Sequence, residues 1–477
     1  MTRPRRPLAV ALPAAVALVI GLTACSGDSN ESSPPAPQTT TVPTETEPAP
    51  PPPPEVTIRV LDGDTSEPVD GARVSVAGQA VETSADGTAR LTGSKGRAAR
   101  VRVSARGYAP RTVRVDMRDD ATRKIAVWRP DLQWAMYGAN PKRTQVHPEI
   151  ELRPPFRQVW RRKVYGLLEF PAVVWEGVAY VNTMKGLVRA VSMKNGRVLW
   201  KRWVGSLMAA SPAVDPAREA LVVTTMVPGG VSVLDLESGR VRWRFPIGAR
   251  VEPSPVIRNG VAYLGAENGS VYALDLDRRR PKWVFSGGAK ITGSPALAGN
   301  RLYVGDYAGR VFALNARTGR RIWTGSAGSR VYGTTAVEGG RVFAPSVFSG
   351  LSALSARTGR LLWRVPVGSY LYSSPAVYRG RVYFGTHGGA VYSVDAGSGR
   401  VLWARSAGGR VSGAVQIVSG IVYAASLEDS ISAWNWRTGK QVWSFPHGEY
   451  VPVSGNGARL LMHGRSELWA VEPRRGR

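Results

Sequence analysis

Six residues that could bind an anion or stack on a ring recur at a fixed spacing in the second half of the chain. They are Arg250, Lys290, Arg330, Tyr370, Arg410 and Tyr450, each 40 residues after the one before. A cleft lined by charges of one sign concentrates its potential, so the series predicts a basic, tyrosine-edged mouth for an anionic ligand or an acidic partner segment. The alternative is a set of solvent-exposed strand starts, where Arg and Lys are common. Glu169 and Glu252, at one shared position two residues further on, would partly neutralise the ring.

Residues that could catalyse a reaction show no recognisable grouping. The histidines are His147, His387, His447 and His463. They lie far apart and have no metal-ligand spacing. The sequence has no phosphate-binding glycine loop followed by Lys-Ser/Thr, and nothing in it favours a Ser/His/Asp set. We therefore expect no catalytic residue, no metal site and a protein that is not an enzyme.

Cys25 is the single cysteine of the chain, which excludes a disulfide within the chain and a cysteine-based metal site. Basic residues and then a short apolar run precede it, a pattern typical of a secretory signal. The residues Leu22-Thr23-Ala24-Cys25 resemble a bacterial lipobox, which implies cleavage after residue 24 and lipidation of Cys25. The alternative is an uncleaved membrane anchor, for which the apolar run is short. Either anchor predicts an extracytoplasmic protein tethered to the cell membrane.

The elements that must position the basic series repeat with the same period, and tryptophans mark them. They are Trp160, Trp200, Trp243, Trp283, Trp323, Trp363, Trp403 and Trp443, and all intervals are 40 residues except one of 43. Each full copy reads as an alternating strand, a Thr/Ser-Gly turn and a strand that carries the Trp. Gly provides the positive φ that such a turn needs, and we expect the copy with Arg279 in its place to have a rebuilt turn. This period is typical of a four-stranded propeller blade.

The alternation along each repeat predicts which positions face inward. Eight residues after each Trp the residue is always apolar, so we expect this position to be buried between blades. The position seven residues after Trp, which includes the basic series, is then expected to begin the innermost strand at one mouth of a central channel. A lone strand-like run at 157–164 precedes the first full repeat, whereas no Trp strand follows 467–471. We predict that this first strand completes the last blade, which removes open sheet edges and gives eight blades.

The stretch from Ala313 to Trp323, Ala-Leu-Asn-Ala-Arg-Thr-Gly-Arg-Arg-Ile-Trp, resembles the tryptophan-docking motif of PQQ-type (quinoprotein-like, BamB-like) β-propellers. The resemblance covers roughly residues 130–475. It implies an all-β fold in which each of the eight tryptophans is a structural docking residue, packed on the small residue and glycine of the neighbouring blade. The family includes PQQ-dependent dehydrogenases and non-enzymatic lipoproteins such as BamB.

The same resemblance provides a test of the dehydrogenase alternative. Those enzymes carry an adjacent cysteine pair, a calcium ion held by Glu and Asn, and a catalytic Asp. The pair is absent here, since Cys25 stands alone, and the remaining residues do not map onto matching positions. We therefore expect no cofactor, with PQQ and calcium implied only under the alternative.

Three further segments complete the predicted domain order. After the signal at 1–24, residues 25–55 form a Pro-rich stretch that predicts an extended stalk. Residues 56–128 have short alternating runs that predict a small β-sandwich, and 70–74 and 105–108 resemble carboxypeptidase regulatory-like, transthyretin-like domains. Residues 129–156 form a connector that we expect across the outside or one mouth of a propeller at 157–475.

The charge of the whole chain indicates the class of partner. Lys and Arg number 63 against 35 Asp and Glu, a net charge of +28, which favours anionic surfaces. We predict a membrane-tethered binding or scaffold lipoprotein whose partners are envelope proteins or an anionic cell-wall polymer. The alternatives are a PQQ-dependent dehydrogenase and a protein that binds cell-wall glycan or polyanion. Nucleic acid is not expected, because the signal predicts export.

Overall fold

The computed structural model describes residues 55–92, 98–117 and 122–474. The predicted signal, Cys25 and all but the last residue of the predicted stalk lie outside these residues. The described chain is all-β: apart from the short 3-10 helices η1 (Pro130–Leu132) and η2 (Pro216–Arg218), its regular elements are strands. No helix in these ranges has the length and apolar character that crossing a membrane requires.

The first seven strands form two sheets with a shared core. They are β1 (Glu55–Asp62), β2 (Arg73–Val76), β3 (Gln79–Glu82), β4 (Thr88–Thr92), β5 (Ala98–Ser104), β6 (Arg111–Asp116) and β7 (Arg123–Val127). One sheet has the order β4-β1-β7 and the other β3-β2-β5-β6. Alternate residues such as Ile58, Val74 and Val103 are fully buried in one cluster, because successive side chains of a strand point to opposite faces.

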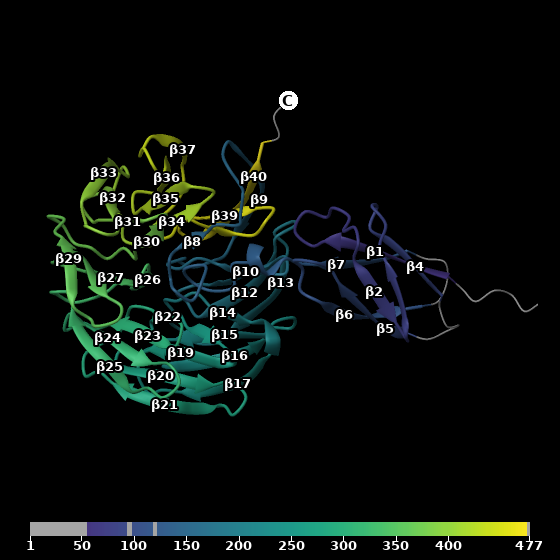
Figure 1. Cartoon of the computed structure of the whole chain (residues 1–477), viewed down its shortest axis with the longest axis horizontal. Helices are drawn as coiled ribbons and strands as arrows, with labels where there is room; N and C mark the ends of the chain where they lie inside the picture. The colour runs from purple at the N-terminus through teal and green to yellow at the C-terminus, as the bar shows by residue number, and fades with distance from the viewer. Residues whose placement is uncertain (1–54, 93–97, 118–121, 475–477) are drawn as a thin grey trace, which may run out of the picture. The chain divides into compact units, whose positions relative to one another are not determined.

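Residues 156–473 form four-stranded antiparallel sheets that follow one another around a common centre (Figure 1). We call them repeat sheets 1 to 8. Sheets 1 to 4 are β10 (Val173–Trp175), β11 (Val178–Asn182), β12 (Leu187–Ser192), β13 (Val198–Trp203); β14 (Ala213–Asp215), β15 (Ala220–Thr225), β16 (Gly230–Asp235), β17 (Val241–Pro246); β18 (Val256–Arg258), β19 (Val261–Gly265), β20 (Ser270–Asp275), β21 (Arg280–Ser286); and β22 (Ala296–Ala298), β23 (Arg301–Gly305), β24 (Arg310–Asn315), β25 (Arg321–Ser326).

Sheets 5 to 8 follow in the same way. They are β26 (Ala336–Glu338), β27 (Arg341–Ser346), β28 (Gly350–Ser355), β29 (Leu361–Val365); β30 (Ala376–Tyr378), β31 (Arg381–Gly385), β32 (Ala390–Asp395), β33 (Val401–Ser406); β34 (Gln416–Val418), β35 (Ile421–Ser426), β36 (Ser430–Asn435), β37 (Gln441–Phe445); and β38 (Val453–Gly455), β39 (Leu460–His463), β40 (Glu467–Pro473) with β9 (Phe156–Lys163). The residues eight positions after Trp are buried, as predicted: Leu168, Met208, Val251, Ile291, Val331, Leu371, Val411 and Val451.

The hairpin that carries each Trp has a bulge beside it. In repeat sheet 4, Ala313 faces Trp323 but Leu314 faces Arg321, so the register shifts by one residue. Such a bulge twists the strand pair locally. The turn contains Gly319 at φ 75°, and in repeat sheet 3 Arg279 adopts φ 56° at the same position. The turn is rebuilt only in part. Arg279 keeps the left-handed conformation that glycine adopts elsewhere, but strand pairing extends one step further here, with Asp275 opposite Arg280.

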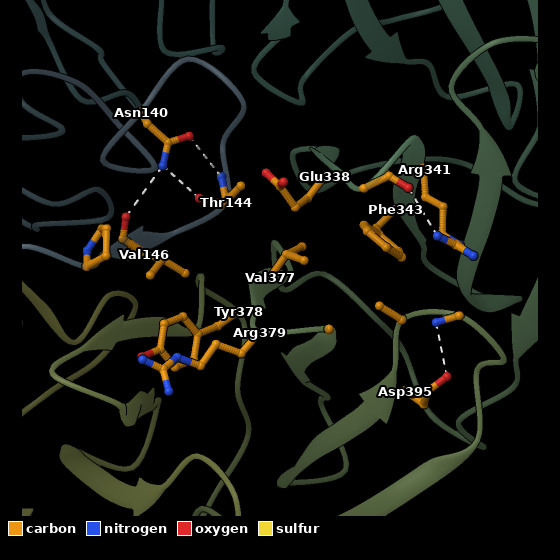
Figure 2. Close-up of a pocket in the computed structure, with 15 residues that line it drawn as sticks. Asn140, Thr144, Val146, Glu338, Arg341, Phe343, Val377, Tyr378, Arg379 and Asp395 are labelled. Carbon is orange, nitrogen blue, oxygen red and sulfur yellow. Dashed lines mark hydrogen bonds between the residues drawn. The ribbon is translucent and has the colours of Figure 1, made fainter.

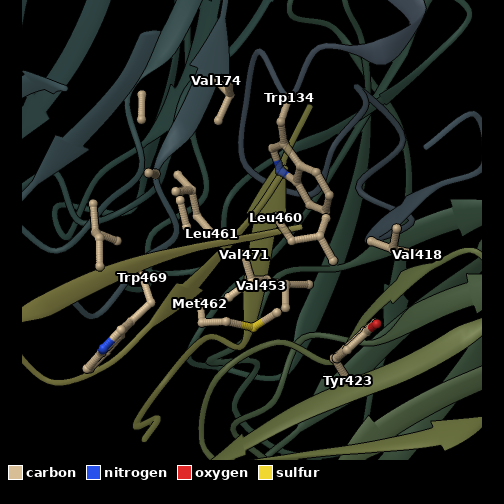
Figure 3. Close-up of a cluster of buried hydrophobic side chains, with 14 of the residues drawn as sticks. Trp134, Val174, Val418, Tyr423, Val453, Leu460, Leu461, Met462, Trp469 and Val471 are labelled. Carbon is tan, nitrogen blue, oxygen red and sulfur yellow. The ribbon is translucent and has the colours of Figure 1, made fainter. Parts of the chain in front are cut away.

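The first strand of the repeat region completes the last sheet, as predicted. β9 pairs antiparallel with β40, and Trp160 lies opposite Ala470. A large cluster of buried side chains fills the space around this closure (Figure 3). It joins Trp134 of the connector to Leu461 and Trp469 of repeat sheet 8 and to Tyr423 of repeat sheet 7. The two ends of the repeat region are thereby held in one core.

The connector follows the innermost strands around the axis. Backbone N–H groups of these strands donate to its carbonyls: Val174 to Trp134, Val214 to Ala135, Leu297 to Pro141, Val337 to Lys142, Val377 to Thr144 and Ile417 to Gln145. In addition, β8 (Val146–His147) pairs in parallel with β34. Of the two positions expected for the connector, the structure shows the mouth, and the segment covers one end of the central channel.

Candidate functional site

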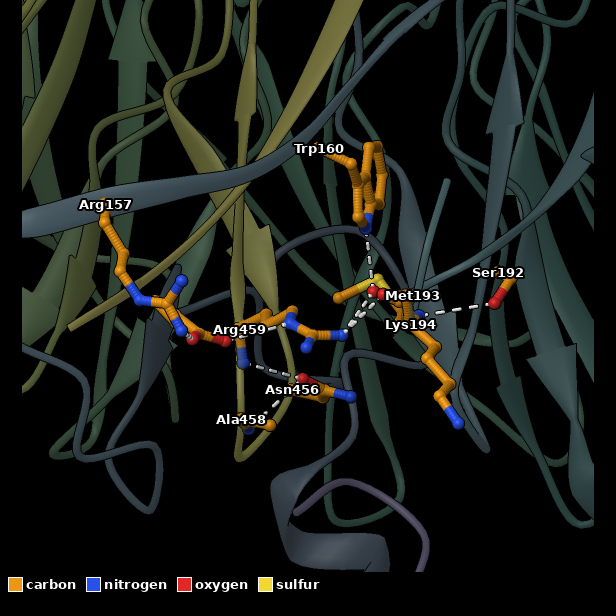
Figure 4. Close-up of polar contacts among 9 residues, drawn as sticks. Arg157, Trp160, Ser192, Met193, Lys194, Asn456, Ala458 and Arg459 are labelled. Atoms are coloured by element: carbon orange, nitrogen blue, oxygen red, sulfur yellow. Dashed lines mark hydrogen bonds and ion pairs between the residues drawn. The ribbon is translucent and has the colours of Figure 1, made fainter. Parts of the chain in front are cut away.

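The repeated tryptophans lie between neighbouring sheets. An alanine at Gly196 would place its Cβ 2.8 Å from the Trp160 ring. An alanine at Gly359 would place its Cβ 2.5 Å from the Trp323 ring. Indole Nε1 donates to a backbone carbonyl of the next sheet. The carbonyl is 33 residues ahead for Trp160 to Met193 at 2.8 Å, Trp283 to Ala316 at 3.0 Å, Trp323 to Ala356 at 3.1 Å, Trp363 to Ala396 at 3.2 Å and Trp403 to Trp436 at 3.3 Å, and 36 residues ahead for Trp200 to Leu236 at 3.0 Å. Figure 4 shows the first of these bonds beside Arg459, which donates to the same carbonyl at 2.8 Å.

Two tryptophans of the series have different surroundings. Trp443 meets Phe156 of β9 edge to face, with ring centroids 5.3 Å apart. Trp243 precedes the sheet in which Arg279 replaces glycine, and it packs with the buried cluster of repeat sheets 2 and 3. These side chains pack between sheets and position them.

The predicted basic series lies in linkers between sheets. Arg250 follows the end of β17 at Pro246 and precedes β18, which begins at Val256. The expectation that this position begins the innermost strand was therefore wrong, because a longer linker separates the sheets. The backbone carbonyls of Arg250, Lys290, Arg330, Tyr370 and Arg410 accept hydrogen bonds from the second hairpin turn of the sheet that follows. For example, the Glu267 N–H donates to the Arg250 carbonyl and the Tyr307 N–H donates to the Lys290 carbonyl, both at 2.9 Å. The series therefore lies at one face of the repeat sheets, the face that the connector does not cover.

The cations of this face are partly neutralised by acidic neighbours. Lys290 pairs with Glu267 at 3.0 Å and Arg410 pairs with Glu428 at 3.1 Å. The sequence predicted partial neutralisation by Glu169 and Glu252, and the structure adds Glu267 and Glu428 as direct partners of two of the four cations. Sequence alone could not show this pairing, because the repeat spacing does not reveal that the second hairpin turns lie beside the linkers.

Aromatic side chains dominate one side of the mouth. We define the aromatic wall as Tyr307, Tyr332, Phe348, Tyr370, Tyr372 and His387. Phe348 and Tyr370 are 5.6 Å apart and are 62% and 50% exposed. The Arg330 guanidinium lies 5.1 Å from the Phe348 ring and 5.8 Å from the Tyr307 ring. The spacing predicted Arg330 and Tyr370; Phe348 was missed, although an apolar ring in a turn that favours polar residues was a usable signal.

The mouth narrows to a small cavity of about 60 Å³. Its lining includes Glu169, Glu252, Tyr332, Tyr372 and Ser412. Tyr332 donates its hydroxyl to Glu252 at 3.1 Å. Burial raises the pKa of Glu252 to about 7 and also raises the pKa of Glu169. The floor is therefore acidic and able to hold a proton near neutral pH, whereas the rim is cationic and aromatic.

A row of hydroxyl groups runs past the cavity, and two of them, on Thr334 and Ser374, line it. Backbone N–H groups of four sheets donate to the hydroxyl of the next: Ser211 to Ser254, Ser254 to Ser294 and Ser294 to Thr334 at 2.9 Å, and Thr334 to Ser374 at 3.0 Å. The fully buried Arg143 of the connector donates to the carbonyls of Ser254 and Pro295, both at 3.0 Å. These contacts fill the channel at the connector end, so the mouth is a closed cup.

The cup gives a poor fit to a PQQ cofactor. A fused tricyclic quinone with three carboxylates needs a pocket of several hundred Å³, since sites for ligands of that size span about 300–1,000 Å³. The cavity here is about 60 Å³, and Glu169 and Glu252 would place carboxylates against those of the cofactor.

Comparisons with known proteins agree with this architecture. A family model described as outer membrane protein assembly factor BamB matches residues 157–276, 184–350 and 285–477. The structure is similar to BamB from Moraxella catarrhalis (TM-score 0.58, 16% identity, 68% of this chain and 99% of that chain). It is also similar to the quinohemoprotein alcohol dehydrogenase from Comamonas testosteroni (TM-score 0.62, 12% identity, 72% and 82%).

A third similar structure is a europium-containing methanol dehydrogenase (TM-score 0.60, 14% identity, 71% of this chain and 91% of that chain). At such identities the likeness concerns the fold alone, which is shared by enzymes and by a non-enzymatic assembly factor. No curated protein matches the chain. The family model, which spans two thirds of the chain, carries the assignment: the chain belongs to the BamB family of PQQ-repeat β-propeller proteins.

Proposed function

We propose that this protein is an extracytoplasmic lipoprotein that binds a partner protein through the aromatic wall. In this proposal Cys25 carries the lipid, the Pro-rich stretch is a stalk and residues 56–128 are a transthyretin-like spacer. The eight repeat sheets are the blades of one propeller. The protein performs no covalent chemistry, and its function is to hold a partner at the cell envelope.

The exposed rings of the wall carry the proposal. Tyr, Trp and Arg are enriched among the residues that dominate protein interfaces, where a few side chains provide most of the binding energy. Phe348 and Tyr370 are exposed side by side, and Arg330 is held against Phe348 by a cation–π contact. A rigid sheet framework positions all three, so a partner would bind them with little loss of side-chain freedom.

The charge pattern favours a protein partner over a simple polyanion. Glu267 and Glu428 pair with two of the four rim cations, and the floor adds Glu169 and Glu252. A protein segment with apolar side chains and a few acidic residues matches such mixed chemistry better than a uniformly charged polymer. Membership of the BamB family supports an envelope protein as this partner.

The proposal is tested by recovery of partners from cells. The tagged wild-type chain and the triple variant Arg330→Ala, Phe348→Ala, Tyr370→Ala are cross-linked in their own cells, purified and compared by quantitative mass spectrometry. We expect one or two envelope proteins in near-stoichiometric amounts with the wild type and at least tenfold less with the variant, as loss of about 2 kcal/mol or more would produce.

Tyr165→Ala is the matched control. Tyr165 is 71% exposed on the linker that follows β9, on the same face but outside the wall, so its replacement removes an aromatic ring and should leave recovery unchanged. Equal recovery with the wild type and the triple variant would contradict the proposal.

An anionic cell-wall polymer is the second candidate, and the net charge of +28 is the observation that favours it. Binding to a charged polymer through exposed cations weakens steeply as the salt concentration rises. If the polymer is the partner, the quadruple variant with Ala at positions 250, 290, 330 and 410 should lose its salt-sensitive binding to purified wall polymer. Unchanged binding by that variant would exclude these four cations as the polymer site.

A further inference from the structure

Two cavities differ in how their charged groups are arranged. The larger, of about 610 Å³, lies between repeat sheets 5 and 6 beside the connector, and Arg341 and Arg379 lie on its opposite sides (Figure 2). Its cations therefore do not converge on one point. The smaller, of about 60 Å³, is the cavity to which the mouth narrows. We call it the acidic cavity, and we define it by six of its lining residues, Glu169, Glu252, Thr292, Tyr332, Tyr372 and Ser412.

The repeat brings these six side chains to one space. All of them occupy the same repeat position, nine residues after a repeated Trp and ahead of the innermost strand of the next sheet. The residue before each of them is buried, whereas the ninth residue lines the shared cavity. Glu169 and Glu252 belong to different linkers, with one further linker between them. Two carboxylates therefore reach one cavity from different directions.

The two carboxylates of the acidic cavity have no cation of their own. Among the described residues, neither Glu169 nor Glu252 forms an ion pair. Lys290 acts electrostatically on Glu252 but pairs with Glu267 at 3.0 Å. The Tyr332 hydroxyl donates to Glu252 at 3.1 Å, which leaves further acceptor positions on that carboxylate. Buried carboxylates are normally paired, so this cavity is suited to a cation from outside the chain.

Aromatic rings around the acidic cavity indicate what kind of cation fits. Tyr332 and Tyr372 meet edge to face with ring centroids 5.3 Å apart, and Phe170 and Tyr450 also line the cavity. The face of an aromatic ring attracts an organic cation, and aromatic cages bind ammonium groups in this way. Calcium is a poorer match, because it takes about six to eight oxygen ligands, and ring faces provide none.

We propose that the acidic cavity binds a primary alkylammonium group, the end of a lysine side chain on the partner protein. That the lysine belongs to a protein rests on the proposed function. An ammonium has three N–H donors, for which Glu169, Glu252 and the Ser412 hydroxyl are acceptors. The cavity has room for about four water molecules, which matches an ammonium and the last methylenes of its stem.

The acidic cavity is continuous with the aromatic wall, because Tyr332 and Tyr372 belong to both. A partner segment that lies on the wall can therefore place a lysine in the cavity. The methylenes of its stem would contact the tyrosine rings while the charged end meets the carboxylates. The rim cations and the acidic cavity then recognise charges of opposite sign on one segment.

n-Butylammonium is the probe, because it reproduces the lysine side chain. We expect the purified full chain to bind it saturably at millimolar concentration by isothermal titration calorimetry. The uncharged n-butanol should bind roughly tenfold more weakly or less. Glu169→Gln and Glu252→Gln should each weaken binding of n-butylammonium roughly tenfold. Glu151→Gln is the matched control, because it removes an exposed carboxylate from the connector, and its binding should equal that of the wild type.

The affinity for n-butylammonium should also depend on pH. Burial raises the pKa of Glu252 to about 7, and a bound cation favours the charged form of this carboxylate. The charged and titratable groups around it are Glu169, Glu267, Lys290, Tyr307 and Tyr332. The probe stays charged, since alkylammonium groups lose their proton near pH 10. The wild-type affinity should rise roughly tenfold from pH 6 to 8, and that of Glu252→Gln should rise less.

Recovery of the partner from cells tests the source of the ammonium. The double variant Glu169→Gln, Glu252→Gln should recover roughly tenfold less of the envelope protein than the wild type does. The thermal unfolding of all variants is measured alongside. The proposal is overturned if the wild type does not bind n-butylammonium, if both Gln variants bind it as the wild type does, or if the double variant recovers the partner unchanged. If the wild type recovers no protein, the proposed function fails, whereas calorimetry still tests the ammonium site.

Discussion

Single residues fix the spacing between neighbouring sheets, and the glycines opposite the tryptophans show how. Gly359 has φ 77°, and a Cβ there would lie 2.5 Å from the Trp323 ring. Gly380 has φ 75° but has open space around its Cβ position. We predict that Gly380→Ala costs about 1 kcal/mol of unfolding free energy from backbone strain alone. Gly359→Ala should cost about 1–3 kcal/mol more, because the ring must move. Urea unfolding measures the change in unfolding free energy for each variant. Equal changes for Gly380→Ala and Gly359→Ala would show that the contact with the Trp323 ring does not limit how closely the sheets approach.

Glu252, on the cavity floor, makes the stability of the folded protein depend on pH. Its pKa is about 7 in the folded protein against an ordinary 4.5, because burial disfavours the charged form. The folded state therefore holds this proton more tightly, and the stabilisation present below pH 4.5 is lost as the pH rises through 7. Between pH 4.5 and 7.5, the free energy of unfolding of the wild type should fall by on the order of 2 kcal/mol relative to that of Glu252→Gln. Urea unfolding across this range measures the difference, with the exposed Glu151→Gln as control for charge removal. A constant difference between wild type and Glu252→Gln would disprove the shift.

At the scale of elements, β9 closes the ring of sheets by pairing with β40. Trp160 of this strand is 8% exposed and donates to Met193 of repeat sheet 1. Trp160→Ala should therefore destabilise the repeat region by about 3–5 kcal/mol, as other buried Trp truncations do. Trp203→Ala is the control, because Trp203 is 59% exposed on β13 and its loss should change stability by less than about 0.5 kcal/mol. Thermal unfolding measures the stability of both variants. Similar losses of stability in Trp160→Ala and Trp203→Ala would mean that the pairing of β9 with β40 contributes little to the stability of the repeat region.

The same elements show what the sequence could predict. The tryptophan period identified β9 as the missing strand of the last sheet, because its Trp lies one repeat before Trp200. It could not place Arg250 correctly, since the period does not give the length of the linker before β18. Arg143 was missed entirely, because a buried arginine without a carboxylate is rare. Phe348 lies in a turn, and turn residues follow no hydrophobic period.

At the scale of the whole molecule, the strands have two ends with different chemistry. The end away from the connector carries the aromatic wall, the paired cations and the acidic cavity. The connector end is closed by Arg143, which donates to the carbonyls of Pro295 and Ser254. The net charge alone predicted a general attraction to anions, whereas the structure shows paired cations, exposed rings and an acidic cavity at one end.

The central claim is that the aromatic wall contacts a partner protein in the cell. The most direct measurement places a photo-cross-linking phenylalanine analogue at position 348, and separately at position 165, in the full chain expressed in its own cells. We expect one cross-linked envelope protein from position 348 after irradiation and none from position 165. We also expect Arg330→Ala to reduce the yield from position 348. The absence of a product at position 348, or the same products from both positions, would contradict this claim.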